Sequence, residues 1–252
     1  MGGVDVREQR LLGILATVRE KGYATTQELA EKFDVSVSTI RRDLAELNQR
    51  GMVAMSKNGV VPVSETIVDT PVNFRSTVNA HAKAAIARNA LQLVRSGSTV
   101  FLDSSSTVLQ MVGGLRSMRD IVVVTNSLPV ARRFQGGPVQ VRLIGGEMSP
   151  ASRGFFGPAA EQALRRFNFD MAFFSPVAVT PQGFAAETIE SAASLRRAAI
   201  EQTQSAVLLF DSTKIGLTRP YNIAHIDVFQ YLITDDDKHT LASRAIVRRV
   251  QL

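Results

Sequence analysis

The sequence contains no cysteine, and that absence excludes several kinds of chemistry. The chain can form neither disulfides nor cysteine-based zinc or iron–sulfur sites, and it has no thiolate nucleophile. Histidine is scarce as well, because only His81, His225 and His239 are present and they are scattered along the chain. We therefore expect no bound metal and no cofactor.

Long apolar runs are also missing. No stretch approaches the roughly 18–20 apolar residues of a membrane-spanning helix. The first residues, MGGVDVREQRLL, lack the charged and then apolar pattern of a signal peptide. The 252 residues are 45% hydrophobic, which suits two domains with real cores. We expect a soluble cytoplasmic protein.

Positive charge is not concentrated at the N-terminus, although the net charge of the chain is +6. Residues 1–60 hold nine Lys and Arg against eight Asp and Glu, and the remainder holds twenty against fifteen. This balance permits an anionic partner. If the first segment binds nucleic acid, the placement of its charges matters more than their total.

The first fifty residues predict three helices. Apolar side chains at helical spacing predict a helix over residues 7–20, which Gly22 ends. Thr26 is the predicted N-cap of a second helix, QELAEKF. After the turn Asp34-Val35-Ser36, Ser36 is the predicted N-cap of a third helix over residues 37–50.

A β-hairpin is predicted to follow the helices. Two short apolar stretches, residues 52–55 and 60–63, surround Lys57-Asn58-Gly59. Asn-Gly is the strongest short hairpin signal. Three helices followed by a hairpin make a winged helix-turn-helix, a DNA-binding domain.

The third helix places arginines on its exposed side. With about 100° per residue, Val37, Leu44 and Leu47 fall on the side of Ile40 and form a buried stripe. Arg42 falls on the opposite side and Arg41 on a flank, near a helix N-terminus that favours anions. Arginine can bond phosphate or a guanine edge bidentately. The alternative is a solvated face with an Arg42–Glu46 pair. The predicted DNA contacts are Thr26, Ser36, Ser38, Thr39, Arg41, Arg42 and Lys57.

The remaining chain predicts a larger α/β domain. Residues 63–78 carry prolines without a clear period and are interpreted as a linker between domains 1–62 and 79–252. A long helix is predicted at 79–94. Strand-like runs at 99–103, 121–125, 139–144, 171–177, 206–211 and 231–234 then alternate with helical stretches at 107–115, 128–134, 158–167 and 189–203. Such alternation indicates a parallel-rich sheet with helices on both faces.

Several predicted strands end in small polar or charged residues. Ligands bind at the carboxyl ends of strands in open α/β sheets, and a helix that begins at residues 105–107 could hold a phosphate. A lysine nearby would add positive charge, and an aspartate could accept hydrogen bonds from sugar hydroxyls. The alternative is that each residue is an ordinary loop residue or helix cap. The candidate effector-binding residues are Asp103, Ser104, Ser105, Ser106, Thr107, Thr125, Asn126, Ser127, Gly145, Gly146, Arg153, Asp211 and Lys214.

Residues 28–51, ELAEKFDVSVSTIRRDLAELNQRG, closely resemble the helix-turn-helix signature of the DeoR family of bacterial transcriptional regulators. The resemblance extends through VVVTNSLPVA at 122–131, LIGGEMSP at 143–150, FFGPAAEQAL at 155–164, LLFDSTKIG at 208–216 and YLITD at 231–235. It implies a sensor domain related in fold to ribose-5-phosphate isomerase. It also implies an effector that is a phosphorylated sugar or a related metabolite and releases the regulator from its operator.

The chain departs from the family pattern at four places. The wing residues Met55, Lys57, Asn58 and Gly59 stand where the family usually has an arginine, a histidine and two glycines. The loop from Asp103 to Thr107 reads DSSST instead of Asp-x-Gly-Thr-Thr, residues 175–178 replace a Gly-x-x-Gly strand end, and residues 192–196 replace Glu-Ala-Glu-x-Lys.

The sequence and the resemblance predict a transcriptional regulator, a repressor of carbohydrate metabolism genes, that is not an enzyme. Its predicted partners are an operator in double-stranded DNA, a small phosphorylated sugar and further copies of itself, as a dimer or tetramer, because useful specificity needs two half-sites. One alternative is an isomerase-like enzyme with acid–base groups among Asp103, Glu187, Asp211 and Lys214. Another is a regulator whose sensor domain no longer responds to a ligand.

Overall fold

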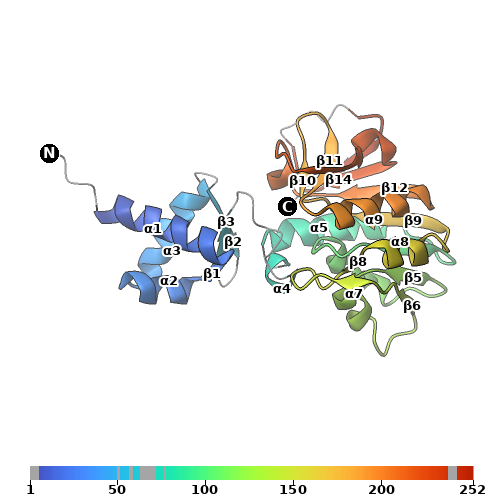
Figure 1. Cartoon of the computed structure of the whole chain (residues 1–252), viewed down its shortest axis with the longest axis horizontal. Coiled ribbons are helices and arrows are strands. Elements are labelled where there is room, and N and C mark those ends of the chain that lie inside the picture. The colour runs from blue at the N-terminus through green and yellow to red at the C-terminus, as the bar shows by residue number, and fades with distance from the viewer. Residues whose placement is uncertain are drawn as a thin grey trace. The chain divides into compact units, whose positions relative to one another are not determined.

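The chain folds into two compact units, Met1–Ala80 and His81–Leu252. The structure, a computed structural model, describes residues 6–49, 52–56, 59–62, 72–76, 78–237 and 243–251. Figure 1 shows the smaller unit in blue and the larger one from green to red. None of the described helices is both long enough and apolar enough to span a bilayer.

The smaller unit is a winged helix-turn-helix. Its helices are α1 (Val6–Lys21), α2 (Thr26–Phe33) and α3 (Val37–Gln49). The strands β1 (Ala24–Thr25), β2 (Val53–Ser56) and β3 (Gly59–Pro62) form an antiparallel sheet in the order β1-β3-β2. Side chains of all three helices and of the sheet meet in one core, which explains why short helices are stable here.

The N-cap of α2 is Thr25, and the prediction of Thr26 was wrong. The Thr25 hydroxyl accepts from the Glu28 N–H at 3.1 Å, and the Glu28 carboxylate accepts from the Thr25 N–H at 2.7 Å. This reciprocal capping box lowers the pKa of Glu28, chiefly through the Thr25 N–H. Ser36 is confirmed as the cap of α3, because its Oγ accepts from the Thr39 N–H at 3.2 Å.

The segment between the domains is described only in part. Within the predicted linker, α4 (Val72–Arg75) is a short helix, while residues 63–71 and 77 lie outside the described residues. Lys57 and Asn58 of the predicted wing tip lie outside them as well. The domain bounds and the DNA contact of Lys57 therefore stay predictions.

The larger unit contains a seven-stranded sheet in which every neighbouring pair is parallel. Its order is β15-β14-β12-β9-β4-β5-β6. The strands are β4 (Thr99–Leu102), β5 (Val122–Thr125), β6 (Gln140–Leu143), β9 (Phe169–Phe174), β12 (Thr203–Leu209), β14 (Tyr231–Thr234) and β15 (Ile246–Arg249). The connecting helices are α5 (Ala80–Leu91), η2 (Val108–Met111), α6 (Val112–Leu115), α7 (Leu128–Arg133), α8 (Pro158–Leu164) and α9 (Glu190–Glu201).

The strand order reverses between β4 and β9. Strands β4, β5 and β6 run outward on one side, and β9, β12, β14 and β15 run outward on the other. This is a topological switch point, where open α/β sheets bind ligands beyond the carboxyl ends of the strands. The central strands are apolar on both faces, and Phe101, Phe173 and Phe174 are fully buried.

The structure contains elements that the sequence pattern did not predict. A small antiparallel sheet, β10-β11-β13, comprises β10 (Ala178–Val179), β11 (Phe184–Glu187) and β13 (Tyr221–His225). The hairpin β7 (Glu147–Met148) and β8 (Phe155–Phe156), the edge strand β15 and the 3₁₀ turns η3 (Ser212–Lys214) and η4 (Ile226–Val228) were also missed. Elements of two to five residues are too short to show a period of their own.

Candidate functional site

Helix α3 presents the predicted DNA-contacting face to solvent. Arg41 and Arg42 are exposed, while Ile40, Leu44 and Leu47 are fully buried. Neither arginine forms an ion pair with a residue that the structure describes. The Arg42–Glu46 pair of the alternative is not among the ion pairs of the described residues, and Glu46 pairs with Arg7 of α1.

Small hydroxyls surround the start of the same helix. Ser36 and Ser38 are exposed, and their Oγ atoms lie 2.7 Å apart. The Ser36 Oγ is also 2.9 Å from the Thr39 Oγ1. Thr26, at the start of α2, is partly exposed. Contact of these side chains with a phosphate backbone stays a prediction.

Asp43 anchors α3 to α1, a role that the sequence reading missed. Its side chain is 1% exposed and accepts from the Arg10 Nε at 2.6 Å and the Arg7 Nε at 3.3 Å. At about 100° per residue, Asp43 lies about 60° from Ile40, on the buried side of the helix. That spacing was the available signal for an internal ion pair.

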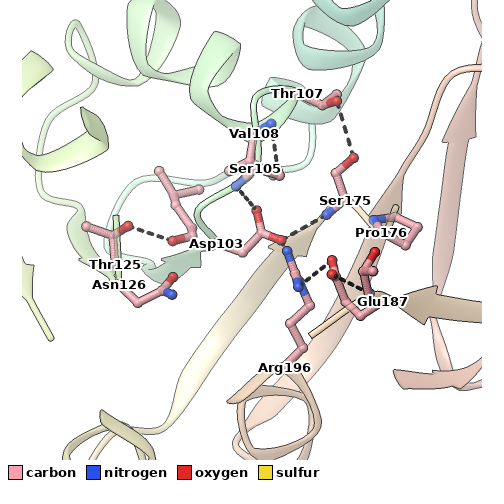
Figure 2. Close-up of polar contacts among 12 residues, drawn as sticks. Asp103, Ser105, Thr107, Val108, Thr125, Asn126, Ser175, Pro176, Glu187 and Arg196 are labelled. Carbon is pink, nitrogen blue, oxygen red and sulfur yellow. Dashed lines mark hydrogen bonds and ion pairs between the residues drawn. The ribbon is translucent and has the colours of Figure 1, made fainter. Parts of the chain in front are cut away.

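Asp103 lies at the centre of a polar cluster at the switch point. It follows β4, and its N–H donates to the Phe173 carbonyl of β9 at 3.2 Å. Its Oδ1 accepts from the Ser105 N–H at 2.9 Å and its Oδ2 from the Ser175 N–H at 3.1 Å. Figure 2 shows the carboxylate between these two backbone groups. Asp103 therefore ties the loop after β4 to the loop after β9.

Arg196 of α9 joins Asp103 to Glu187 in a buried ion-pair network. Its Nε donates to the Asp103 Oδ2 at 2.9 Å and its Nη1 to the Glu187 Oε1 at 2.7 Å (Figure 2). The side chains of Arg196 and Glu187 are each 7% exposed, and the side chain of Asp103 is 2% exposed. Burial alone would lower the pKa of Arg196, but the charges of Glu187 and Asp103 outweigh it and raise that pKa.

Sequence reasoning missed the ion pairs of Arg196 and considered Glu187 only as an acid–base group. The available signal was again helical spacing. Arg196 falls in the stripe of α9 that contains the buried residues Ala192, Ala193 and Ala199. A charged residue inside an apolar stripe requires a buried partner of opposite charge.

The serine-rich loop after β4 is enclosed, because Ser104, Ser105, Ser106 and Thr107 are all buried. The Ser105 Oγ accepts from the Val108 N–H at 3.3 Å. Ser105 is not among the residues with positive φ, so serine carries no backbone strain there. Within the described part of the chain, the N–H groups of Ser106 and Thr107 meet no acceptor.

Lys214 reaches the serine-rich loop through Ser175. Its Nζ donates to the Ser175 Oγ at 2.8 Å and to the Pro176 carbonyl at 2.7 Å. The Ser175 Oγ in turn lies 3.2 Å from the Thr107 Oγ1. A positive charge and two unused backbone donors thus lie around one small region at the switch point.

Asn126 offers an acceptor beside this region. The register Leu102↔Thr125 puts Asn126 next to Asp103 at the ends of adjacent strands (Figure 2). Its Nδ2 donates to the Phe155 carbonyl at 3.0 Å, which fixes the orientation of the amide. Asn126 is 1% exposed, and its Oδ1 is buried without a donor among the described residues. A neighbouring molecule with a hydroxyl would satisfy it.

Thr125 and Ser127 have structural partners at the same strand end. The Thr125 Oγ1 donates to the Leu102 carbonyl at 2.7 Å and accepts from the Ser127 N–H at 3.0 Å. The Ser127 Oγ accepts from the Val130 N–H at 3.3 Å and caps α7. Both side chains are buried and hold the end of β5 in place beside the Asp103 cluster.

Four other predicted site residues lie elsewhere at the carboxyl edge. Gly145 and Gly146 are exposed after the edge strand β6, and a Cβ on Gly146 would lie 2.6 Å from the Phe156 carbonyl oxygen. Arg153 is exposed, with φ +51°. Asp211 is buried after β12 and accepts from the Thr213 Oγ1. Effector contact by any of these residues stays a prediction.

Nothing in the described part of the chain resembles a metal centre. No group of three or more His, Cys, Asp or Glu side chains gathers there in a way that could hold a metal ion. The charged cluster at the switch point instead combines two carboxylates with the arginine that pairs with both.

Both parts of the chain match known families. Residues 10–66 match the DeoR-like helix-turn-helix domain, and residues 78–236 match the DeoR C terminal sensor domain. The chain is 30% identical over 228 residues to the glycerol-3-phosphate regulon repressor of Escherichia coli, covering 90% of each chain. It is 29% identical over 236 residues to the transcriptional repressor AccR of Agrobacterium fabrum, covering 93% of this chain and 92% of that one. The L-fucose operon activator of Haemophilus influenzae is 30% identical over 222 residues, covering 88% of this chain and 89% of that one.

Among solved structures, the chain is similar to a ribose 5-phosphate isomerase A from Methanocaldococcus jannaschii. The TM-score is 0.41 at 15% identity, with 54% of this chain and 55% of that chain covered. The similarity is too distant to support any conclusion about activity.

Proposed function

The chain belongs to the DeoR family of transcriptional regulators, and from that premise we propose that it represses carbohydrate metabolism genes under the control of a phosphorylated sugar. Helix α3 binds the operator. The effector occupies the switch point of the larger sheet and releases the protein from DNA. An operator with two half-sites is bound by two copies of the chain, so the proposal includes a homodimer or tetramer.

The exposed face of α3 supports the DNA-binding part of the proposal. Arg41 and Arg42 project from the first turns of the helix and lack ion-pair partners among the described residues. Arg42→Ala should weaken operator binding by about 1–3 kcal/mol and relax sequence preference if Arg42 contacts a base. Arg41→Ala should weaken binding to all sequences and reduce the salt slope by about one unit if Arg41 contacts phosphate.

The measurement is operator binding at several salt concentrations. Arg119→Ala is the matched control, because it removes one exposed positive charge from the larger unit. The melting temperature should change little in any of these variants. Unchanged operator affinity in the Arg41→Ala/Arg42→Ala double variant would rule out α3 as the recognition helix.

The unused hydrogen-bonding groups at the switch point carry the effector part of the proposal. The N–H groups of Ser106 and Thr107 can donate to phosphate oxygens, and Lys214 adds a positive charge next to them. The Asn126 Oδ1 can accept from a sugar hydroxyl. One molecule with a phosphate and hydroxyls complements both sets. The altered loop still offers donors, which argues against a sensor domain that has lost its ligand.

Lys214→Ala tests this site. Without effector the variant should bind operator as tightly as the wild type, because Lys214 belongs to the larger unit. With a sugar phosphate selected by thermal shift, the variant should stay bound at concentrations that release the wild type, since a ligand shifts an equilibrium only through differential affinity. Wild-type release by the variant would refute the role of Lys214. No thermal shift with any sugar phosphate would favour the ligand-insensitive regulator.

The isomerase alternative has little support from the same geometry. A general base must accept a proton, but Asp103 already accepts from two backbone N–H groups and from Arg196. Glu187 likewise pairs with Arg196 and accepts from the Thr188 N–H at 3.1 Å. We propose that the chain is not an enzyme. Turnover of pentose or hexose phosphates by the purified protein would contradict this.

A further inference from the structure

The guanidinium of Arg219 has one covered edge without an acceptor. Arg219 lies in the loop between η3 and β13, and the residue as a whole is partly exposed. Its Nη1 donates to the Thr218 carbonyl at 2.7 Å. Its Nε and Nη2 are buried and have no hydrogen-bond partner. The loop therefore orients the side chain and leaves two of its nitrogen donors unused.

The two unused nitrogens point to an oxyanion. The N–H groups on Nε and Nη2 form one edge of the guanidinium, which matches two oxygens of a carboxylate or phosphate. Arginine stays charged at any physiological pH, and Arg219 forms no ion pair with a described residue. Water could satisfy the two donors but would leave the positive charge unbalanced.

Arg219 precedes β13 at the end of the small sheet where Glu187 ends β11. Strands β11 and β13 pair with Glu187 opposite Tyr221, so Thr188 and Arg219 leave the two strands at the same end. The Thr188 Oγ1 is also buried without a partner. Glu187 connects this end to Asp103 through Arg196.

Arg196 is not an alternative site for an added anion. It already pairs with two carboxylates, both buried with it. The carboxylates of Asp103 and Glu187 would repel a further negative charge there at short range. No carboxylate among the described residues pairs with Arg219.

We propose that Arg219 binds a carboxylate or phosphate group of a small-molecule anion, side-on through Nε and Nη2. The group has two possible sources. It is either a second acidic group on the proposed effector or a separate inorganic anion. If the first holds, the effector is a sugar bisphosphate or a phosphorylated sugar acid, and this reading rests on the proposed effector site.

The test compares Arg219→Gln and Arg219→Lys with the wild type in the full-length chain. Arg197→Lys is the matched control, because Arg197 lies next to the same small sheet and its Nη1 donates to the Asn222 carbonyl at 2.6 Å. Calorimetric titration uses inorganic phosphate, a hexose monophosphate, a hexose bisphosphate and a phosphorylated aldonic acid. Melting temperatures are measured without ligand.

If the acidic group is part of the effector, Arg219→Gln should weaken binding of the bisphosphate or the phosphorylated acid by about tenfold or more. Binding of the monophosphate should change by less than about twofold. If the anion is separate, Arg219→Gln should instead weaken the binding of inorganic phosphate and leave the affinities for the three sugar ligands unchanged. Arg219→Lys should restore only part of the affinity in either case, since lysine keeps the charge but loses the two-pronged geometry.

Three results would overturn the inference. The first is that Arg219→Gln binds every probe with unchanged affinity. The second is that Arg219→Gln loses affinity equally for every probe and has a lower melting temperature. The third is that Arg219→Lys restores the full affinity. The proposed effector site is tested separately by wild-type binding of the monophosphate. If the wild type does not bind the monophosphate but binds inorganic phosphate through Arg219, the proposed effector site is refuted. The inference about Arg219 is then still supported.

Discussion

Arg196→Met should destabilise the larger unit strongly, because it leaves two carboxylates buried without their cation. Methionine preserves much of the side-chain length but neither hydrogen bond to Asp103 and Glu187. Removing one partner of a buried ion pair typically costs about 3–5 kcal/mol. Asp103 keeps the Ser105 and Ser175 N–H groups as donors, so its carboxylate is not left bare. We therefore expect a loss within that range rather than above it.

The control is Arg165→Met, which removes an ion pair of similar length at the surface. The Arg165 Nη1 lies 2.6 Å from the Glu201 Oε2, and the two side chains are 48% and 56% exposed. Such pairs contribute about 0–1 kcal/mol. If the length of an ion pair alone set its contribution to stability, the Arg165–Glu201 pair would contribute at least as much as the pairs of Arg196. The comparison therefore isolates the effect of burial.

The assay is differential scanning calorimetry of the full-length chain. Arg196→Met should lower the transition of the larger unit and leave that of the smaller unit in place, since the two units have separate cores. Adding Glu187→Gln to Arg196→Met should recover part of the loss, because one uncompensated charge is then removed. Equal effects of Arg196→Met and Arg165→Met would show that the network is not desolvated and would refute this reasoning.

Three further predictions concern single side chains. Thr25→Ala should lower the stability of the smaller unit by about 1 kcal/mol and Thr26→Ala by clearly less, measured by calorimetry, because only Thr25 caps α2; equal losses would contradict the assignment. Ser105→Gly should tighten binding of a hexose monophosphate in calorimetric titration by opening the loop, whereas weaker binding would identify the serine as a ligand contact. Burial raises the pKa of Asp235, the Ser212 N–H opposes that rise and the charge of Asp211 adds to it. Stability should therefore fall as the pH rises from the ordinary carboxyl value through the raised one, and Asp235→Asn should flatten that part of the melting-temperature profile.

Local sequence patterns predicted the elements that carry the DNA-binding face and the main sheet. Six of the seven strands of the large sheet were predicted, because buried parallel strands form continuous apolar runs. The exposed position of Arg41 and Arg42 followed from helical spacing, which is an intrinsic property of the helix. The resemblance to one family was carried by motifs in both domains, and the family matches confirm it.

Contacts between distant segments could not be predicted in this way. Thr25 and Thr26 are equally good caps by residue type, and only the backbone geometry at the end of β1 selects Thr25. The pairing of Arg196 with Asp103 joins residues 93 positions apart, and no local pattern along the chain indicates that the two side chains meet.

The sequence by itself determined the helices of the smaller unit and six strands of the large sheet, which face of α3 meets solvent, and which residue types stand at the strand ends. Those properties depend on spacing along the chain. Only the tertiary structure decided that Ser106, Thr107, Asn126 and Lys214 surround one region while Gly145 and Gly146 lie at an edge, and that Arg219 keeps two buried donors unused. Strand order and burial set those relations, and neither is encoded in the local period of the sequence.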